Sequence, residues 1–170
     1  MTLIGCPAPS LAEICRENAP SHVMTLASPG KQAPGVLPEV AHLHLAFNDI
    51  AEARPGLVLP SEEDARRIVA FGRTWDGARP LLVSCEFGVS RSTAALFAIA
   101  CDRRPDLTEG TIADRLRAAA PCATPNPLLV SLADRILGRQ DRMIMAAAAI
   151  GRGADYAPYR SFQLALPPAG

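Results

Sequence analysis

The amino-acid sequence predicts an α/β fold in which a mostly parallel central sheet is flanked by helices and followed by a helical C-terminal part. Up to about residue 100, apolar strand-like segments alternate with segments of helical periodicity, which is typical of a parallel sheet with helices on its faces. Beyond Cys101 the pattern turns helical as far as about Ile150. The apolar run Pro80–Ser84 leads through a glycine-containing turn into the alanine-rich segment Ser92–Cys101. The pattern there predicts a strand, a tight turn and a helix in direct succession.

The first half of the chain is predicted to supply the strands. They are expected at Leu3–Cys6, His22–Ala27, Val40–Phe47 and Leu81–Ser84. Ser10 is expected to cap a helix that runs to about Asn18, with Glu13 completing a capping box. Ser61 is expected to cap a second helix through about Trp75, with Asp64 in its first turn. The intervening segments, Ser28–Pro38 and Asn48–Pro60, are predicted loops.

The second half is predicted to be helical. After the helix Ser92–Cys101, further helices are expected at Thr108–Ala120, Leu128–Leu137 and Gln140–Ile150, and the proline-rich stretch Pro121–Pro127 separates the first two of these. The tail Gly151–Gly170 carries one apolar patch, Phe162–Leu166. Three alternatives stay open for the tail: it packs as an extended segment, covers the site or stays mobile. The whole chain, residues 1–170, is predicted to form a single domain with 151–170 as its extended C-terminal tail.

Composition excludes several classes of partner. The formal net charge is zero, so bulk charge favours binding neither to nucleic acid nor to an anionic membrane. No apolar stretch approaches the roughly 20 residues of a membrane-spanning helix, and the N-terminus lacks the features of a signal peptide. The five cysteines are odd in number and show no C-x2-C pairing, which favours reduced thiols over a disulfide framework or a zinc site. A cytoplasmic protein is therefore expected, and its oligomeric state is left open.

The segment from Cys85 to Ser92 carries the chemistry. A thiol at the end of a strand, followed by a tight turn and a helix start, forms an anion site from backbone N–H groups and the helix N-terminus. The same positive environment favours a thiolate, so Cys85 is expected to have a depressed pKa and to act as a nucleophile. The planar guanidinium of Arg91 is able to grip two oxygens of a phosphate, which a lysine ammonium cannot do. A buried structural cysteine beside an arginine at a helix start is the alternative.

This segment resembles the C-x5-R loop of the cysteine-dependent protein tyrosine and dual-specificity phosphatases, usually written H-C-x-x-G-x-x-R-[ST]. Cys85, Gly88, Arg91 and Ser92 match the pattern, and Ser84 replaces the leading histidine. The resemblance, which is to bacterial members of the superfamily, implies the phosphatase fold and hydrolysis of a phosphomonoester through a phosphocysteine intermediate. It requires neither a metal nor a cofactor. The partner it implies is a phosphorylated substrate, either a phosphoprotein or a small phosphomonoester. The residues expected to surround the phosphate are Glu86, Phe87, Gly88, Val89, Ser90 and Arg91.

The resemblance also implies one Asp, on a loop upstream of the cysteine, that protonates the leaving group and then activates water. Asp49 lies 36 positions before Cys85, directly after a predicted strand, and is the expected general acid. Its alternative is a turn aspartate. Glu52 and Asp76 are the next candidates, and Asp76 is the poorer because it lies only nine positions before Cys85.

Several other side chains in and near the loop also have expected roles. Ser92 is expected either to donate to the Cys85 sulfur when the thiolate leaves or to cap its helix. Ser84 either replaces the histidine in holding the loop or is merely a serine at a strand end. Glu86 is expected to point away from the phosphate and to accept from arginine or backbone donors. Phe87 is a candidate wall for an aromatic substrate, whereas Phe47 is expected in the core.

His42 and His44 lie on one face of a predicted strand. Hydrogen-bonded strand histidines are favoured over a metal site there, because no carboxylate or thiol lies close in the sequence to complete a ligand set.

Two rival functions remain open. A phosphate-binding pseudophosphatase, catalytically weak or inactive, is favoured by Ser84 in place of histidine. An arsenate reductase or a low-molecular-weight tyrosine phosphatase also uses C-x5-R. Those proteins carry the loop near the N-terminus, which disagrees with the mid-chain position of Cys85.

Overall fold

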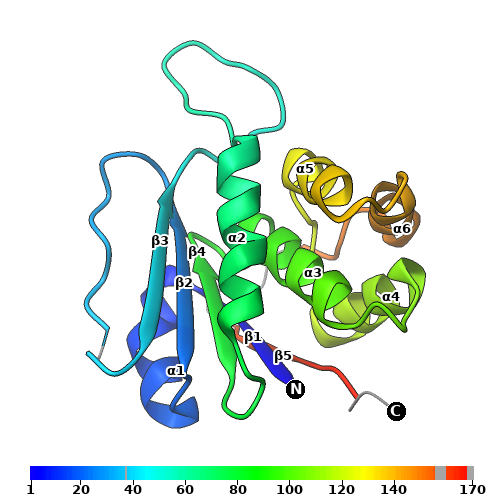
Figure 1. The fold of residues 1–170 in the computed structure, drawn as a ribbon. Coiled ribbons are helices and arrows are strands. Elements are labelled where there is room, and N and C mark those ends of the chain that lie inside the picture. The colour runs from blue at the N-terminus through cyan, green and yellow to red at the C-terminus, as the bar shows by residue number, and fades with distance from the viewer. Residues whose placement is uncertain (37, 156–159, 168–170) are drawn as a thin grey trace.

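A five-stranded sheet with the order β3-β2-β4-β1-β5 forms the centre of the molecule (Figure 1). The computed structural model describes residues 1–36, 38–155 and 160–167. Four strands run parallel, and the fifth, β5, pairs antiparallel with β1 at one edge. The strands are β1 (Thr2–Pro7), β2 (His22–Ala27), β3 (Ala41–Ala46), β4 (Leu81–Cys85) and β5 (Phe162–Ala165). The predicted α/β class with a mostly parallel central sheet is therefore confirmed, and the apolar patch of the tail forms the edge strand.

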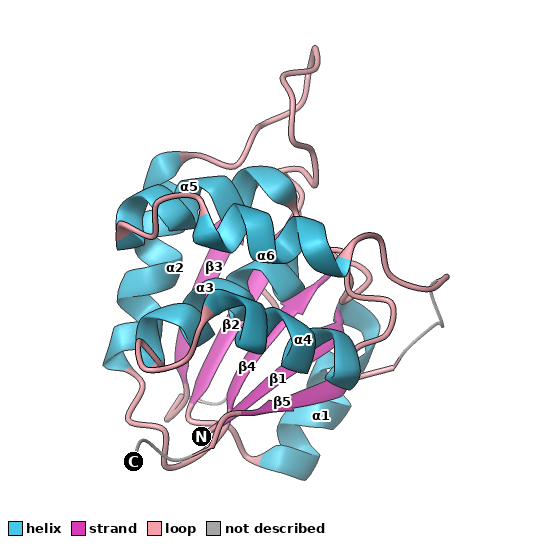
Figure 2. Cartoon of the chain, turned by 90° about the vertical axis from the view of Figure 1, so that its right-hand side faces the viewer, coloured by secondary structure: helices cyan, strands magenta, loops and turns pink. Residues whose placement is uncertain are grey.

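Helices cover both faces of the sheet, but unequally. On one face lies α1 (Leu11–Asn18), preceded by the short 3-10 helix η1 (Ala8–Ser10). The other helices cover the opposite face (Figures 1 and 2). They are α2 (Glu62–Thr74), α3 (Arg91–Arg103), α4 (Glu109–Ala119), α5 (Pro127–Leu137) and α6 (Arg142–Ile150). Among the described residues, no helix is long and apolar enough to cross a membrane.

The helix α3 lies at the centre of the larger of the two hydrophobic cores among the described residues. Every residue from Arg91 to Cys101 is buried, so the small alanine side chains let neighbouring elements pack closely around it. Gly72 of α2 is one such close contact, because a Cβ there would lie 2.8 Å from Cγ1 of Ile99. This packing fixes the first turn of α3, which carries Arg91 and Ser92, in a rigid environment.

The helix starts test the predicted caps. Ser61 and Asp64 form the reciprocal capping box expected at an S-x-x-D sequence: the Asp64 N–H donates to Ser61 Oγ over 3.1 Å, and the Ser61 N–H donates to Asp64 Oδ2 over 2.9 Å. The capping box predicted at Ser10 is wrong. Ser10 belongs to the 3-10 helix η1 and has helical dihedrals, φ −91° and ψ −4°, so its side chain makes no capping hydrogen bond. The extended backbone that a capping side chain needs is absent there.

Other boundaries shift by one or two residues. β4 extends to Cys85, β3 ends at Ala46, and α3 begins at Arg91. α6 begins two residues later than predicted because Gln140 and Asp141 take left-handed dihedrals, with φ of 53° and 66°.

Two long loops flank β3 in the chain. The crossover loop, Ser28–Val40, carries the chain from the end of β2 back to the start of β3 and forms no helix in its described part, which omits residue 37. The projecting loop, Asn48–Ser61, comes after β3 and extends beyond the sheet before α2 (Figure 1). Its base is closed by two hydrogen bonds of 2.8 Å, from the Asn48 N–H to the Val58 carbonyl and from the Val58 N–H to Asn48 Oδ1.

Candidate active site

The turn between β4 and α3 is held against the end of β1. Gly88 has φ 72°, a left-handed conformation that side-chain-bearing residues rarely adopt. A Cβ at Gly88 would lie 2.9 Å from the backbone nitrogen of Pro7 and 3.0 Å from the carbonyl carbon of Cys6. Both the dihedral and the close approach therefore require glycine, which explains the glycine of the sequence motif in physical terms.

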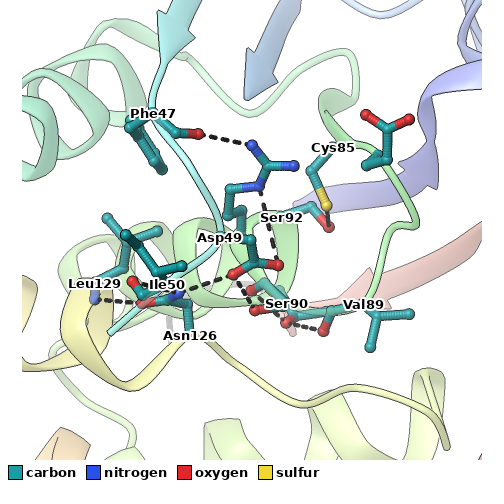
Figure 3. A network of polar contacts seen from close by, with 12 residues as sticks. Phe47, Asp49, Ile50, Cys85, Val89, Ser90, Ser92, Asn126 and Leu129 are labelled. Carbon is teal, nitrogen blue, oxygen red and sulfur yellow. Dashed lines mark hydrogen bonds and ion pairs between the residues drawn. The ribbon is translucent and has the colours of Figure 1, made fainter. Parts of the chain in front are cut away.

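Cys85 and Ser92 meet at the start of α3. The Cys85 Sγ donates to Ser92 Oγ over 3.2 Å, and Cys85 is only 3% exposed (Figure 3). If the sulfur is deprotonated, the same hydroxyl is in position to donate to the thiolate. The alternative, that Ser92 caps the helix, is wrong, because the N-cap position belongs to Ser90.

Arg91 is buried beside this pair with unused hydrogen-bonding capacity. Its Nη1 donates to the Phe47 carbonyl over 2.8 Å, which anchors one side of the guanidinium. Its Nε has no hydrogen-bond partner among the described residues, although the side chain is only 3% exposed. A buried guanidinium N–H without an acceptor is unusual, and a bound oxyanion would supply the missing acceptor.

Asp49 lies where the sequence predicts it, at the root of the projecting loop and next to the turn. Its Oδ1 accepts from Ser90 Oγ over 2.7 Å and from Asn126 Nδ2 over 2.8 Å (Figure 3). Its Oδ2 lies 4.0 Å from Arg91 Nε, and about a third of the side chain is exposed. One carboxylate oxygen is therefore engaged by neutral donors, while the other faces the arginine.

The two rival carboxylates lie elsewhere. Asp76 accepts from the Ala78 N–H over 2.9 Å in the turn before β4, at the opposite end of that strand from Cys85. Glu52 is exposed in the projecting loop. Of the three candidates, only Asp49 shares hydrogen bonds with the turn.

Asn126 is a site residue that the sequence analysis missed. Its Nδ2 donates to Asp49 Oδ1 and, over 3.3 Å, to the Ile50 carbonyl. Its Oδ1 accepts from the Leu129 N–H over 3.0 Å and so caps α5. Its backbone N–H donates to the Ser90 carbonyl over 3.2 Å. The Asn-Pro pair at a helix start was a readable capping signal, but nothing local to it indicates contact with a residue 77 positions away.

Two side chains of the turn point outward. Glu86 forms an ion pair with Lys31 of the crossover loop, not with arginine or backbone donors as expected. Phe87 is 58% exposed beside Glu86, whereas Phe47 is fully buried in the core as predicted.

Ser84 does not take over the role implied for the family's histidine. Its side chain is buried, and within the described ranges its Oγ has no partner other than the weakly hydrogen-bonding thiol of Cys6. In the sheet its neighbours are Cys6 on β1 and Thr25 on β2.

His42 and His44 both have a partner, as favoured from the sequence. His42 Nε2 lies 3.0 Å, and His44 Nδ1 2.8 Å, from Thr25 Oγ1. Burial lowers the pKa of His42, and the neighbouring His44 adds to this effect. In residues 1–36, 38–155 and 160–167, no group of three or more side chains is arranged to hold a metal ion.

Three thiols away from the turn are poor nucleophiles. Burial raises the pKa of Cys6 to about 12, and it also raises the pKa values of Cys15 and Cys101. A buried thiol in apolar surroundings stays protonated and is chemically inert near neutral pH.

Comparison with known proteins places the fold. The chain matches no protein-family model and no curated protein sequence. Its structure is similar to that of DUSP15, with a TM-score of 0.61 and 17% identity over 87% of this chain and 89% of that one. It is similar to human DUSP28, with a TM-score of 0.60 and 18% identity over 82% and 93% of the two chains. It is also similar to the phosphatase domain of Yvh1 from Chaetomium thermophilum, with a TM-score of 0.58 and 18% identity over 83% of this chain and 93% of that one. The chain has the fold of the dual-specificity phosphatases.

Proposed function

We propose that the protein is a cysteine-dependent phosphomonoester hydrolase of the dual-specificity type. One observation carries the proposal: the thiol of Cys85, the buried and partly unsatisfied guanidinium of Arg91 and the carboxylate of Asp49 converge at one turn. A nucleophile, an oxyanion-binding group and an acid are the three functions that hydrolysis through a covalent intermediate needs.

In the first step, the Cys85 thiolate attacks phosphorus and the bond from phosphorus to the ester oxygen breaks. The backbone N–H groups of Glu86 to Arg91 and the N-terminus of α3 stabilise the equatorial oxygens, together with the Arg91 side chain. The leaving oxygen takes a proton from Asp49. Because Oδ1 already accepts two hydrogen bonds, Oδ2 is the atom that carries this proton.

In the second step, water attacks the phosphocysteine and the S–P bond breaks. Asp49 accepts the proton of the water, and inorganic phosphate leaves. The Ser92 hydroxyl, 3.2 Å from the sulfur, donates to the departing thiolate. The positive field of the turn takes the place that a Mg²⁺ ion has in other phosphoryl-transfer enzymes, so neither metal nor cofactor enters the scheme.

A phosphate-reading module without turnover is the second candidate. The observation in its favour is Ser84, whose hydroxyl makes no hydrogen bond to the turn in the described part of the chain. Such a turn keeps its anion site but is held less firmly at the nucleophile than one anchored by histidine.

Hydrolysis of p-nitrophenyl phosphate in the presence of EDTA separates these functions. The wild-type protein should turn over, and Cys85→Ser should not, although it should still bind vanadate because the cradle is formed by the backbone and Arg91. Vigorous turnover by Cys85→Ser would refute the covalent mechanism. Vanadate binding by a wild-type protein that never turns over would establish the binding module instead.

A further inference from the structure

A cavity of about 610 Å³ lies on the face of the sheet that α1 covers, behind the turn that carries Cys85. It exists because the crossover between two parallel strands usually contains a helix that covers the sheet, whereas the described part of the crossover loop contains none (Figure 1). The walls come from the sheet, α1 and the crossover loop. They include Leu11, Cys15, Val23, Thr25, Val36 and Ser84.

The sheet beneath the cavity has an apolar layer and a polar row. Ile4, Val23 and Leu82 pack with Leu11 and Ile14 of α1 into a separate small core. Two residues further along each strand, on the same face of the sheet, four polar side chains lie next to one another in register. In strand order from β3 to β1, this polar row is His44, Thr25, Ser84 and Cys6.

The polar row is only partly satisfied. Thr25 Oγ1 is used by both strand histidines. Ser84 lines the cavity and is 2% exposed, and among the described residues the weakly hydrogen-bonding Cys6 thiol beside it on β1 is the only group that pairs with its Oγ. Buried hydroxyl groups nearly always have a strong hydrogen-bond partner, so a hydroxyl at the wall of a cavity with only a thiol beside it marks a place where a ligand atom would bind.

The charge around the row favours a neutral ligand. Burial keeps the Cys6 thiol protonated, since it raises the pKa of that group to about 12. The charged side chains that line the cavity are exposed at its rim or paired, as Lys31 is with Glu86. A charged group placed at Ser84 would therefore be desolvated without a counter-charge, which is costly.

We propose that this cavity binds a neutral amphipathic small molecule, with its apolar body against Leu11 and Val23 and a hydroxyl or amide head hydrogen-bonded to Ser84 Oγ. Its volume lies in the range of known small-molecule sites, and apolar walls with a few polar groups are their usual composition. The cavity adjoins the anion-binding turn, because Ser84, Cys85 and Glu86 all belong to its lining. Binding there does not depend on the proposed hydrolysis.

Methyl NMR with 1-octanol tests the proposal, with octanoate as the charged control of equal chain length. Octanol should shift the methyl signals of Leu11, Val23 and Val36 saturably, and should leave Val130 in the opposite core unmoved. Octanoate above pH 7 should not shift them. Equal binding of octanoate would overturn the neutral head.

Two variants locate the head and the body. Ser84→Ala should weaken octanol binding about 2- to 10-fold, the value of one hydrogen bond. Ala27→Leu, at the cavity wall, should abolish binding by filling space, while Ala70→Leu on the exposed side of α2 should not. Unchanged affinity in Ser84→Ala would refute the assigned head position. If the methyl signals of the cavity residues show contact with water and do not shift with octanol, the cavity holds only water and the proposal is wrong.

Discussion

Replacing Asn126 by serine separates its two tasks, since serine is able to cap α5 but is too short to reach Asp49. The variant loses the 2.8 Å hydrogen bond from Nδ2 to Asp49 Oδ1 and the 3.3 Å bond to the Ile50 carbonyl. A hydrogen bond to a charged group contributes about 1.5–3 kcal/mol when buried, and partial exposure of Asp49 places this one at the low end. We therefore expect the variant to lose about 1.5 kcal/mol of the interaction energy that holds the Asp49 carboxyl in position. This corresponds to roughly a tenfold slower step wherever protonation of the leaving group matters.

Two substrates and two further variants provide the assay. An unactivated alkyl phosphate should slow about tenfold in kcat/KM, while p-nitrophenyl phosphate, whose leaving group scarcely needs a proton, should change little. Asn126→Ala should show the same kinetic pattern but melt earlier, because it also loses about 1 kcal/mol of helix capping. In an Asp49→Asn background, Asn126→Ser should have no further effect on the alkyl phosphate. If kcat/KM fell equally on both substrates, or if the effects of Asn126→Ser and Asp49→Asn were fully additive, Asn126 would only cap α5 and would not position the acid.

The remaining predictions concern the turn and the buried thiols. Arg91→Lys should lower kcat/KM, because an ammonium is a single point charge and the transition state loses several kcal/mol of stabilisation. Kinetics close to those of the wild type would mean that the guanidinium does not face the phosphate. Cys85 should be the cysteine alkylated first by iodoacetate near neutral pH, with protection by phosphate, and peptide mapping that finds another thiol labelled first would contradict its role. Gly88→Ala should cost about 1–3 kcal/mol of unfolding free energy and abolish vanadate binding, since both the dihedral and the approach to β1 exclude a side chain. The free energy of unfolding should fall as pH rises from about 9 towards 12, because the unfolded chain loses the Cys6 proton near 9.0 while the folded protein holds it to about 12. Cys15 and Cys101, whose pKa values burial also raises, add to this slope, so Cys6→Ala should reduce it in part, and an unchanged slope in urea titrations would contradict the contribution of Cys6.

The turn could be predicted from the sequence because its residues are close together in the chain. Contacts between segments that are far apart in the chain could not be predicted. Cys85, Gly88 and Arg91 lie within seven consecutive positions, and an apolar run before them and an alanine-rich run after them define the strand and the helix. Asp49 was predictable because the carboxyl ends of parallel strands lie at the same edge of the sheet, and this holds for β3 and β4 although β2 lies between them. Asn126 was not, because only the packing of the α4–α5 connection against the turn brings it there.

The cavity escaped prediction for a related reason. A crossover without a helix has the sequence of an ordinary proline- and glycine-containing loop. The space that it leaves open depends on how α1 packs, which no periodicity in the loop reveals.

The structure divides the candidate site into a rigid half and a variable half. Cys85, Arg91 and Ser92 sit at the end of a buried strand and in the first turn of a buried helix, where dense packing holds their geometry. Asp49 instead belongs to a loop, but to its root, which the Asn48–Val58 hydrogen bonds close and Asn126 ties to the turn. The residues of the loop beyond that root are exposed and make no hydrogen bond to the acid among the described contacts. Under the proposed mechanism, catalysis therefore resides in the root and the turn, and choice of substrate resides in the tip of the projecting loop and in the exposed Phe87.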